Sequence, residues 1–102
     1  MNHMNIDVSK NGTSLLMTVS GRIDPTTASE FEKAVMENLD GVQDFVLDLK
    51  DVPYTSSAGL RTLLLAQKKM MKQQGSMTLK NVQSSVLEVL KVTSYIKFLN
   101  IQ

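Results

Sequence analysis

The fold of this 102-residue chain is decided by one segment, Phe45-Val46-Leu47-Asp48-Leu49-Lys50-Asp51-Val52-Pro53-Tyr54-Thr55-Ser56-Ser57-Ala58-Gly59-Leu60-Arg61. Its first five residues are almost continuously apolar, which is typical of a strand covered by helices on both faces of its sheet. A short polar stretch and two adjacent serines follow, and a helix with apolar residues at helical spacing is expected to begin at Ser57 or Ala58. The segment therefore predicts a buried strand, a loop and a helix in direct succession.

The sequence on either side repeats this alternation of strand and helix. The pair Asn11-Gly12 lies between two β-type runs, which predicts an N-terminal hairpin. The later alternation implies right-handed crossovers and a mostly parallel sheet. We expect strands at 5–9, 14–20, 44–49, 76–79 and 97–101, and helices at about 25–39, 57–74 and 83–92. The prediction is a single α/β domain over residues 1–102, with a mixed central β-sheet, an N-terminal hairpin and α-helices packed against the sheet.

The first helix has two candidate N-terminal caps. Asp24 followed by Pro25 fits a cap with proline at the first helical position, where its missing N–H is not needed. Thr27 with Glu30 three residues later fits a capping box instead. Either start leaves one apolar stripe toward the core, formed by Ala28, Phe31, Val35 and Leu39.

Helical spacing also predicts the buried sides of the other two helices. In the second helix we expect Lys68 and Lys69 to face solvent. Its expected core-facing residues are Leu60, Leu63, Leu64 and Met71. The expected core-facing residues of the third helix are Val86, Leu87, Val89 and Leu90.

Composition excludes several classes of protein. A hydrophobic content of 42% is ordinary for one packed core. Eleven basic residues against ten acidic ones, with aromatic residues at only 5%, argue against a surface that binds nucleic acid directly. The absence of cysteine excludes disulfides, thiol catalysis and zinc–thiolate sites.

The N-terminal sequence and the apolar runs bear on localisation. Residues 1–5 lack the basic segment and apolar run of a signal peptide. The longest apolar runs are far shorter than the roughly 20 residues that span a bilayer. We therefore expect a soluble cytoplasmic protein with no membrane partner.

Two adjacent hydroxyl groups, those of Ser56 and Ser57, stand at the expected N-terminus of the second helix. Serine oxygens accept hydrogen bonds from the unpaired backbone N–H groups there, so either residue is a candidate cap. The same N–H groups and the helix dipole favour a phosphate, and Ala58 and Gly59 leave the backbone open to approach. The pattern indicates a phosphorylation switch. A merely capped helix in a scaffold or sensor subunit, or a domain that binds a small anion, are the alternatives.

Two motifs carry a family resemblance. Residues Asp51 to Leu60 follow the pattern Asp-hydrophobic-x-aromatic-x-Asp-Ser-Ser/Ala-Gly-Leu, with Ser56 where the second Asp usually stands. Gly21-Arg22-Ile23-Asp24 matches a Gly-x-Leu/Ile-Asp turn ahead of the first helix. In these motifs, and in the order of elements over nearly the whole chain, the sequence resembles the anti-sigma factor antagonists and sulfate-transporter C-terminal (STAS) domains. The resemblance implies a bacterial phosphoprotein that regulates transcription by partner switching.

The resemblance also implies particular site residues and partners. Ser57, directly before Ala58-Gly59-Leu60, corresponds to the phosphoacceptor, and Ser56 is the alternative. The implied partners are an ATP-binding serine kinase that acts as an anti-sigma factor, and a serine phosphatase that removes the phosphate. Family antagonists commonly continue into a further C-terminal helix, whereas this sequence stops at Gln102, so a partner contact by that helix would be missing. The implied partner-binding surface comprises Asp24, Thr55, Ser56, Ser57, Ala58, Gly59 and Arg61.

The sequence evidence for an enzyme is weaker than that for a regulatory protein. Thr55-Ser56-Ser57-Ala58-Gly59 partly resembles the Gly-x-Ser-x-Gly nucleophile elbow of hydrolases. A serine nucleophile needs an adjacent base, and the only histidine is His3 in the N-terminal segment. No phosphate-binding Gly-rich loop with Lys is present, and the separate turns that hold Asp24, Asp48 and Asp51 indicate loop hydrogen bonds instead of a magnesium site. We expect no enzymatic activity, no cofactor and no metal.

Overall fold

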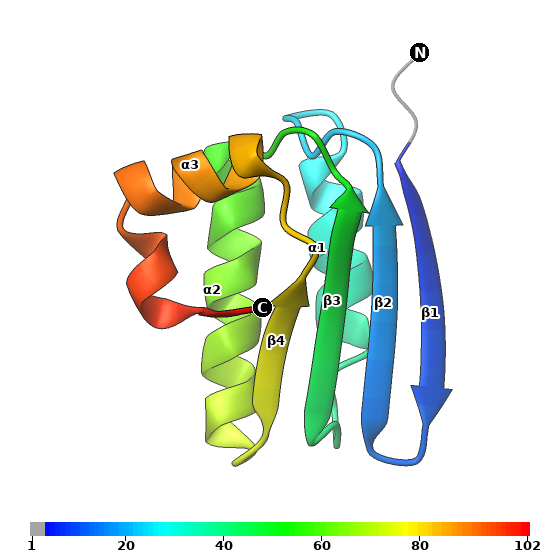
Figure 1. Ribbon diagram of the computed structural model, residues 1–102. Helices are drawn as coiled ribbons and strands as arrows, with labels where there is room; N and C mark the ends of the chain where they lie inside the picture. The colour runs from blue at the N-terminus through cyan, green and yellow to red at the C-terminus, as the bar shows by residue number, and fades with distance from the viewer. Residues whose placement is uncertain (1–3) are drawn as a thin grey trace.

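The computed structural model describes residues 4–102, so His3 lies outside the described residues. The described residues form five strands and three α-helices. The first two strands form an N-terminal hairpin, and helices and strands alternate after it (Figure 1), which confirms the predicted α/β class. The elements in chain order are β1 (Asn5–Asn11), β2 (Ser14–Ser20), α1 (Ala28–Glu37), β3 (Asp44–Asp51), α2 (Ser57–Lys72), β4 (Ser76–Lys80), α3 (Ser84–Val92), the 3₁₀ helix η1 (Tyr95–Phe98) and β5 (Asn100–Ile101).

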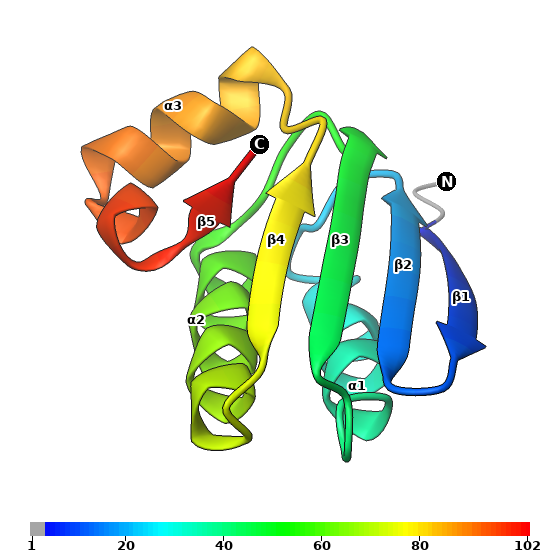
Figure 2. The same ribbon diagram turned by 60° about the horizontal axis from the view of Figure 1, so that its bottom comes forward.

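The sheet is mixed, and its strands follow one another in the order β1-β2-β3-β4-β5. β1 is antiparallel to β2, and every later neighbour pair is parallel. Because the strand order never reverses, crossovers of one hand leave their helices on the same side of the sheet. Figures 1 and 2 show α1 and α2 together behind the sheet, while α3 crosses near the carboxyl end of β4.

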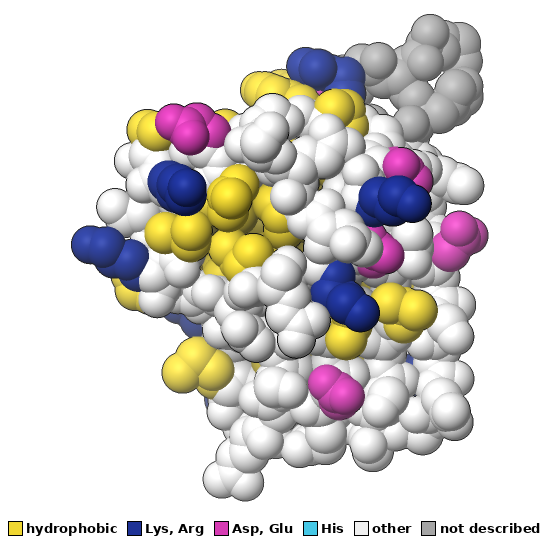
Figure 3. All heavy atoms as spheres, in the orientation of Figure 1, with side chains coloured by type: hydrophobic (Ala, Val, Ile, Leu, Met, Phe, Trp, Pro, Cys, Tyr) yellow, Lys and Arg dark blue, Asp and Glu magenta, His cyan; other side chains and the backbone are white. Residues whose placement is uncertain are grey.

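This one-sided arrangement corrects the expectation that β3 is covered on both faces. Phe45, Leu47 and Leu49 are buried under the helices, while Val46 and Asp48 on the other face are only half-buried. Figure 3 shows basic and acidic side chains interspersed over that other face, which is open to solvent. The apolar run in β3 therefore consists of three residues that face the helices, Phe45, Leu47 and Leu49, and one valine, Val46, on the opposite face.

The hairpin forms one residue later than the Asn-Gly pair suggested. Asn11 still pairs with Ser14 as the last rung of β1 and β2, so the loop consists of Gly12 and Thr13. Gly12 has a φ of 62°, in the left-handed region that glycine adopts without a steric penalty. Gly12 is therefore the residue that makes this tight turn possible.

Helix α1 begins at Ala28, three residues after the earlier of the two predicted starts. Thr27 occupies the N-cap position, but its side chain makes no capping hydrogen bond. Its hydroxyl donates to the backbone oxygen of Arg22 instead, at 2.7 Å. The predicted capping box is therefore absent, and the predicted apolar stripe is confirmed because Ala28, Phe31, Val35 and Leu39 are all buried.

In α2 the predicted helix is correct but its predicted buried face is partly wrong. Leu60 and Leu63 are buried, whereas Leu64 is half-buried and Met71 is 66% exposed. The true buried stripe is rotated by about a quarter of a turn, at 100° per residue, because small residues allow α2 to approach the sheet and α1 closely. It comprises Gly59, Leu60, Thr62, Leu63, Ala66 and Met70.

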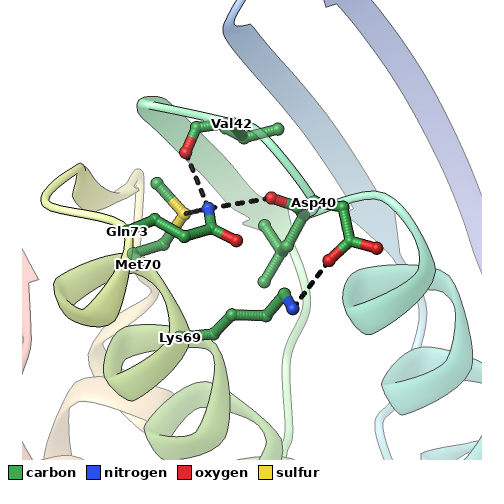
Figure 4. A network of polar contacts seen from close by, with 6 residues as sticks. Asp40, Val42, Lys69, Met70 and Gln73 are labelled. Atoms are coloured by element: carbon green, nitrogen blue, oxygen red, sulfur yellow. Dashed lines mark hydrogen bonds and ion pairs between the residues drawn. The ribbon is translucent and has the colours of Figure 1, made fainter.

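The C-terminal end of α2 is tied to the loop that follows α1 (Figure 4). The side-chain amide of Gln73 donates to the backbone oxygens of Leu39 and Val42, at 3.0 and 2.8 Å. Lys69 forms an ion pair with Asp40 at 2.7 Å, and its side chain is only 31% exposed. The expectation that Lys69 is largely solvated is therefore wrong, while Lys68 is exposed as predicted.

The third helix is confirmed, with Val86 and Leu90 buried and Leu87 and Val89 half-buried. The expected strand at 97–101 is mostly wrong, because Tyr95–Phe98 form a 3₁₀ turn and only Asn100 and Ile101 pair with β4. Ser94 precedes this turn with a φ of 65° and redirects the chain. Within residues 4–102, no helix has the length and apolar character needed to cross a membrane.

Candidate functional site

The two sequence motifs meet in space at one end of the sheet. The serine loop, residues 52–56, joins β3 to α2 and lies beside the Gly21–Asp24 segment that joins β2 to α1. The backbone N–H of Ile23 donates to the oxygen of Tyr54 at 3.0 Å, and the N–H of Ser56 donates to the oxygen of Ile23 at 2.7 Å. These bonds form a parallel bridge between Ile23 and Thr55. Backbone pairing therefore fixes the position of the serines relative to Asp24.

Gly59 allows α2 to start directly against this bridge. A Cβ atom at Gly59 would lie 2.2 Å from the hydroxyl oxygen of Thr55 and 2.7 Å from Cγ2 of Ile23. Both distances are far shorter than the roughly 3.5–4 Å of a favourable contact between heavy atoms. Gly59 is thus a packing requirement of the site, and not only a residue that leaves the backbone accessible.

The two serines have different environments. Ser56 is the N-cap of α2, is only 9% exposed, and its hydroxyl oxygen accepts a hydrogen bond from the N–H of Gly59 at 3.4 Å. Ser57 is the first helical residue and is exposed. Ser56 is therefore the cap of this helix, and Ser57 presents its hydroxyl to solvent beside the free N–H groups of the first turn.

Asp24 is nearly buried in the turn before α1. Its carboxylate accepts hydrogen bonds from the hydroxyl and the N–H of Thr26, at 2.6 and 2.9 Å, and from the N–H of Thr27 at 3.2 Å. These bonds favour the charged form, so the pKa of Asp24 lies below its ordinary value, with the Thr26 hydroxyl as the largest cause. Asp24 therefore organises the turn from outside the helix, rather than capping a helix that begins at Pro25.

Tyr54 and Arg22 add an exposed edge to the site. The guanidinium carbon of Arg22 lies 4.3 Å above the ring centroid of Tyr54, a cation–π contact between the two loops. Tyr54 is 37% exposed, so it both anchors the loop and remains accessible. The sequence motif contained Arg22, but gave no role to its side chain, because the ring it contacts lies thirty-two residues away.

A shallow groove of about 380 Å³ opens between α1 and α2 next to Ser57. Arg61 and Ala58 of α2 form one wall, which brings two of the predicted partner-binding residues to this groove. The other wall was not predicted, because nothing in the sequence indicates which face of α1 lies against α2. It comprises Ala28, Ser29, Glu32 and Lys33.

The predicted site residues therefore divide into two groups. Ser57, Ala58 and Arg61 are exposed at the start of α2, where another protein could contact them. Asp24, Thr55, Ser56 and Gly59 are buried and hold the loop in place.

Of the aspartates considered for a metal site, Asp24 and Asp48 accept hydrogen bonds instead. Asp48 accepts hydrogen bonds from the N–H of Lys50 and from the side-chain amide of Asn81, at 3.0 and 3.1 Å. In the part of the chain that the structure describes, no three His, Cys, Asp or Glu side chains gather as a metal site would require.

The structure is a small α/β domain with a mixed sheet, α1 and α2 on one face, and an exposed serine at the start of the helix after β3. The chain belongs to the STAS domain family, whose model matches residues 5–102. The resemblance inferred from the two motifs is thereby confirmed.

Two relatives are similar over most of their length. BtrV of Bordetella bronchiseptica, assigned as an anti-sigma factor antagonist, is 30% identical over 91% of this chain and 81% of its own. The anti-sigma-B factor antagonist of Bacillus subtilis is 28% identical over 89% of this chain and 84% of its own.

Solved structures share the fold at lower identity. The crystal structure of an anti-sigma factor antagonist from Mycobacterium paratuberculosis has a TM-score of 0.84 at 24% identity, and the match covers 97% of this chain and 85% of that one. The Bacillus cell fate determinant SpoIIAA in its phosphorylated form has a TM-score of 0.74 at 10% identity, with 96% and 91% covered.

Proposed function

We propose that this protein is an anti-sigma factor antagonist that is switched by phosphorylation of Ser57. In its unmodified form it binds a serine-kinase-type anti-sigma factor, and the phosphorylated form is released. The observation that carries the proposal is the contrast between the two serines, because Ser57 is exposed while Ser56 is buried as the helix cap. The names of the two relatives support the same function.

The reaction assigned to the partner is a phosphoryl transfer from ATP. The γ-phosphoryl group moves to Oγ of Ser57, the hydroxyl loses its proton, and ADP leaves. The kinase supplies ATP, so this protein itself needs no cofactor and performs no catalysis. A phosphatase hydrolyses the phosphoserine and restores the hydroxyl. Since ATP is the donor, the proposed switch operates in the bacterial cytoplasm.

The effect of the phosphate follows from its charge. It adds about −1.5 to −2 charges at pH 7 at a residue that had none. Within the protein, the positive end of α2 favours this charge by roughly 0.3–1 kcal/mol, so the fold is retained. In an interface, the same charge must be desolvated at a cost of several kcal/mol. Because each ~1.4 kcal/mol is tenfold in affinity, this cost is enough to release the partner.

The proposed partner surface centres on the exposed start of α2. Ser57, Ala58 and Arg61 contact the partner directly in this proposal, and the groove between α1 and α2 extends the surface. Asp24, Thr55, Ser56 and Gly59 act through the position of the loop. Tyr54 and Arg22 add a contact at its edge.

The decisive experiment is mass spectrometry after incubation with the cognate kinase and ATP. A kinase gene near this protein's own gene would identify the cognate kinase. We expect phosphate on Ser57, none on Ser57→Ala, and full phosphorylation of Ser56→Asp. The last variant is the matched control, because aspartate is also a favourable N-cap. Phosphate on Ser56 would contradict the site assignment, and no phosphate on either serine would favour a constitutive scaffold or an anion-binding domain.

A second experiment separates contact from positioning at Asp24. Asp24→Asn keeps an oxygen that accepts from Thr26 and Thr27 but loses the charge, whereas Asp24→Ala loses both. If Asp24 acts only through the turn, Asp24→Asn binds the anti-sigma factor normally and Asp24→Ala is weakened in both stability and binding. Loss of binding in a stable Asp24→Asn variant would instead identify a direct contact.

A further inference from the structure

A second groove lies on the outer side of α2, toward the C-terminal end of the chain. It has a volume of about 480 Å³ and is formed by α2 and η1. The side-chain amide of Gln67 donates to the backbone oxygen of Phe98 at 2.9 Å, which fastens η1 to α2 and preforms the groove. We call this surface the α2–η1 groove, and its lining residues are Leu64, Gln67, Lys68, Met71, Lys97 and Phe98.

The floor of the α2–η1 groove is apolar and exposed. Met71 and Phe98 are 66% and 59% exposed, and Leu64 beside them is half-buried. Adjacent large apolar side chains around a concave surface are unusual on a monomer and mark sites of interaction. The flexible side chain of Met71 can adapt to different partners, and methionine and aromatic residues such as Phe98 are enriched in protein–protein interfaces. This surface therefore suits a protein partner.

The rim of the groove is basic. Lys68 and Lys97 are its only charged lining residues. The whole of α2 carries Arg61, Lys68, Lys69 and Lys72 and contains no Asp or Glu. Of these, Lys69 is already paired with Asp40 on the other side of the helix. The charge at the groove therefore complements an acidic occupant.

We propose that the α2–η1 groove docks an amphipathic helix with acidic flanks, supplied by a partner protein. Leu64, Gln67, Lys68 and Met71 have the i, i+3, i+4, i+7 spacing of one helix face. A second helix laid along this face places its own apolar positions on Met71 and Phe98 and its Glu or Asp residues near Lys68 and Lys97. This is the helix-in-groove mode of recognition, in which apolar anchors give affinity and flanking charges give specificity.

The groove is a separate surface from the proposed phosphorylation site. Lys68 is eleven residues beyond Ser57 along α2, about 16 Å at 1.5 Å per residue. The proposal does not depend on phosphorylation of Ser57, and its failure would leave that proposal intact. Helix α1 of a second copy fits the groove poorly, because its acidic exposed positions, Glu30 and Glu37, are accompanied by Ser29 and Lys33 rather than large apolar residues.

The test uses a synthetic helical peptide of about 14 residues, four helical turns. Its leucines occupy i, i+3, i+4 and i+7 positions, and glutamates flank them; the control peptide has lysine at every glutamate position. Fluorescence anisotropy with the full chain should show binding of the acidic peptide that weakens as salt rises. The lysine peptide should bind at least tenfold more weakly.

Variants of the protein locate the binding surface. Phe98→Ser should weaken binding of the acidic peptide at least tenfold, and the double variant Lys68→Glu with Lys97→Glu should reverse the preference between the peptides. Val92→Ser is the matched control, because Val92 is 76% exposed on α3 but does not line the groove. Thermal melts establish that each variant is folded. Equal affinity for the two peptides, or no effect of Phe98→Ser, would overturn the proposal. Sedimentation that revealed self-association, lost in Phe98→Ser, would overturn it in favour of a second copy.

Discussion

Gly59→Ala tests the reasoning about the site most directly, because two opposing effects can be compared. Alanine is a better helix former than glycine by up to about 1 kcal/mol, so propensity alone predicts a more stable protein. The structure predicts the opposite, since the new methyl group would lie 2.2 Å from the Thr55 hydroxyl oxygen and 2.7 Å from Cγ2 of Ile23. Neither neighbour moves easily: Thr55 is 5% exposed, and Ile23 is β-branched and 2% exposed.

Overpacking of this kind costs typically 1–3 kcal/mol, and the very short distance to Thr55 places Gly59→Ala near the upper end. After the gain in propensity, we expect a net loss of about 1–2 kcal/mol in the free energy of unfolding. Urea denaturation followed by circular dichroism measures this loss as a lower midpoint at an unchanged slope.

A second substitution identifies the cause. In the background of Thr55→Ala, the closer of the two contacts is gone, so Gly59→Ala should cost measurably less than in the original protein. Thr55→Ala alone provides the reference for this double-mutant cycle. A Gly59→Ala protein as stable as the original, or the same cost in both backgrounds, would refute the close-packing argument.

Three further predictions concern the core, the cap and the turn. Leu63→Ala should lower the free energy of unfolding by about 2–5 kcal/mol and Leu64→Ala by less than half as much, because Leu63 is 2% exposed and Leu64 only half-buried; equal losses in urea melts would mean that the helix phase is wrong. Ser56→Ala should cost about 0.5–2 kcal/mol and Ser57→Ala less than about 0.5 kcal/mol, and a larger loss at Ser57 would contradict the assignment of the cap. Hydrogen bonds, that from the Thr26 hydroxyl first, lower the pKa of Asp24 below its ordinary value, so its stabilising effect is fully present above that ordinary value and is lost as the pH falls through the lowered pKa. Asp24→Asn should therefore flatten the acid limb of the stability–pH curve, and an unchanged limb would rule out this linkage.

The order of elements could be predicted because the sequence signals for each strand, turn and helix lie within a few consecutive residues. The alternation around Phe45–Leu49, the helical spacing after Ser57 and the Asn11-Gly12 pair each act over a few residues, and the elements from β1 to α3 lie within a few residues of where these signals placed them. The two motifs were also sufficient to recognise the STAS family. Local signals failed at the C-terminus, where the apolar residues Phe98, Leu99 and Ile101 suggested a strand but belong mostly to a 3₁₀ turn and its exit.

Burial could not be predicted as well, because it depends on which elements become neighbours. The phase of α2 was misjudged because large apolar residues such as Leu64 and Met71 look more like core than Ala66 or Gly59 do. Close packing of two helices and a sheet favours small side chains at the contact, so these small residues lie inside and Met71 lies outside. Similarly, a strand order that never reverses leaves one face of β3 open, which no local pattern reveals.

The sequence by itself determined that two adjacent hydroxyl groups stand at the start of a helix, because the turn, the serines and the helical spacing are contiguous. Only the tertiary structure decided which of them caps the helix and which is exposed. The bridge between Ile23 and Thr55 turns Ser56 inward as the cap and leaves Ser57 exposed. The physical reason is that a serine's accessibility depends on contacts with a segment more than thirty residues away, and such contacts exist only after the chain has folded.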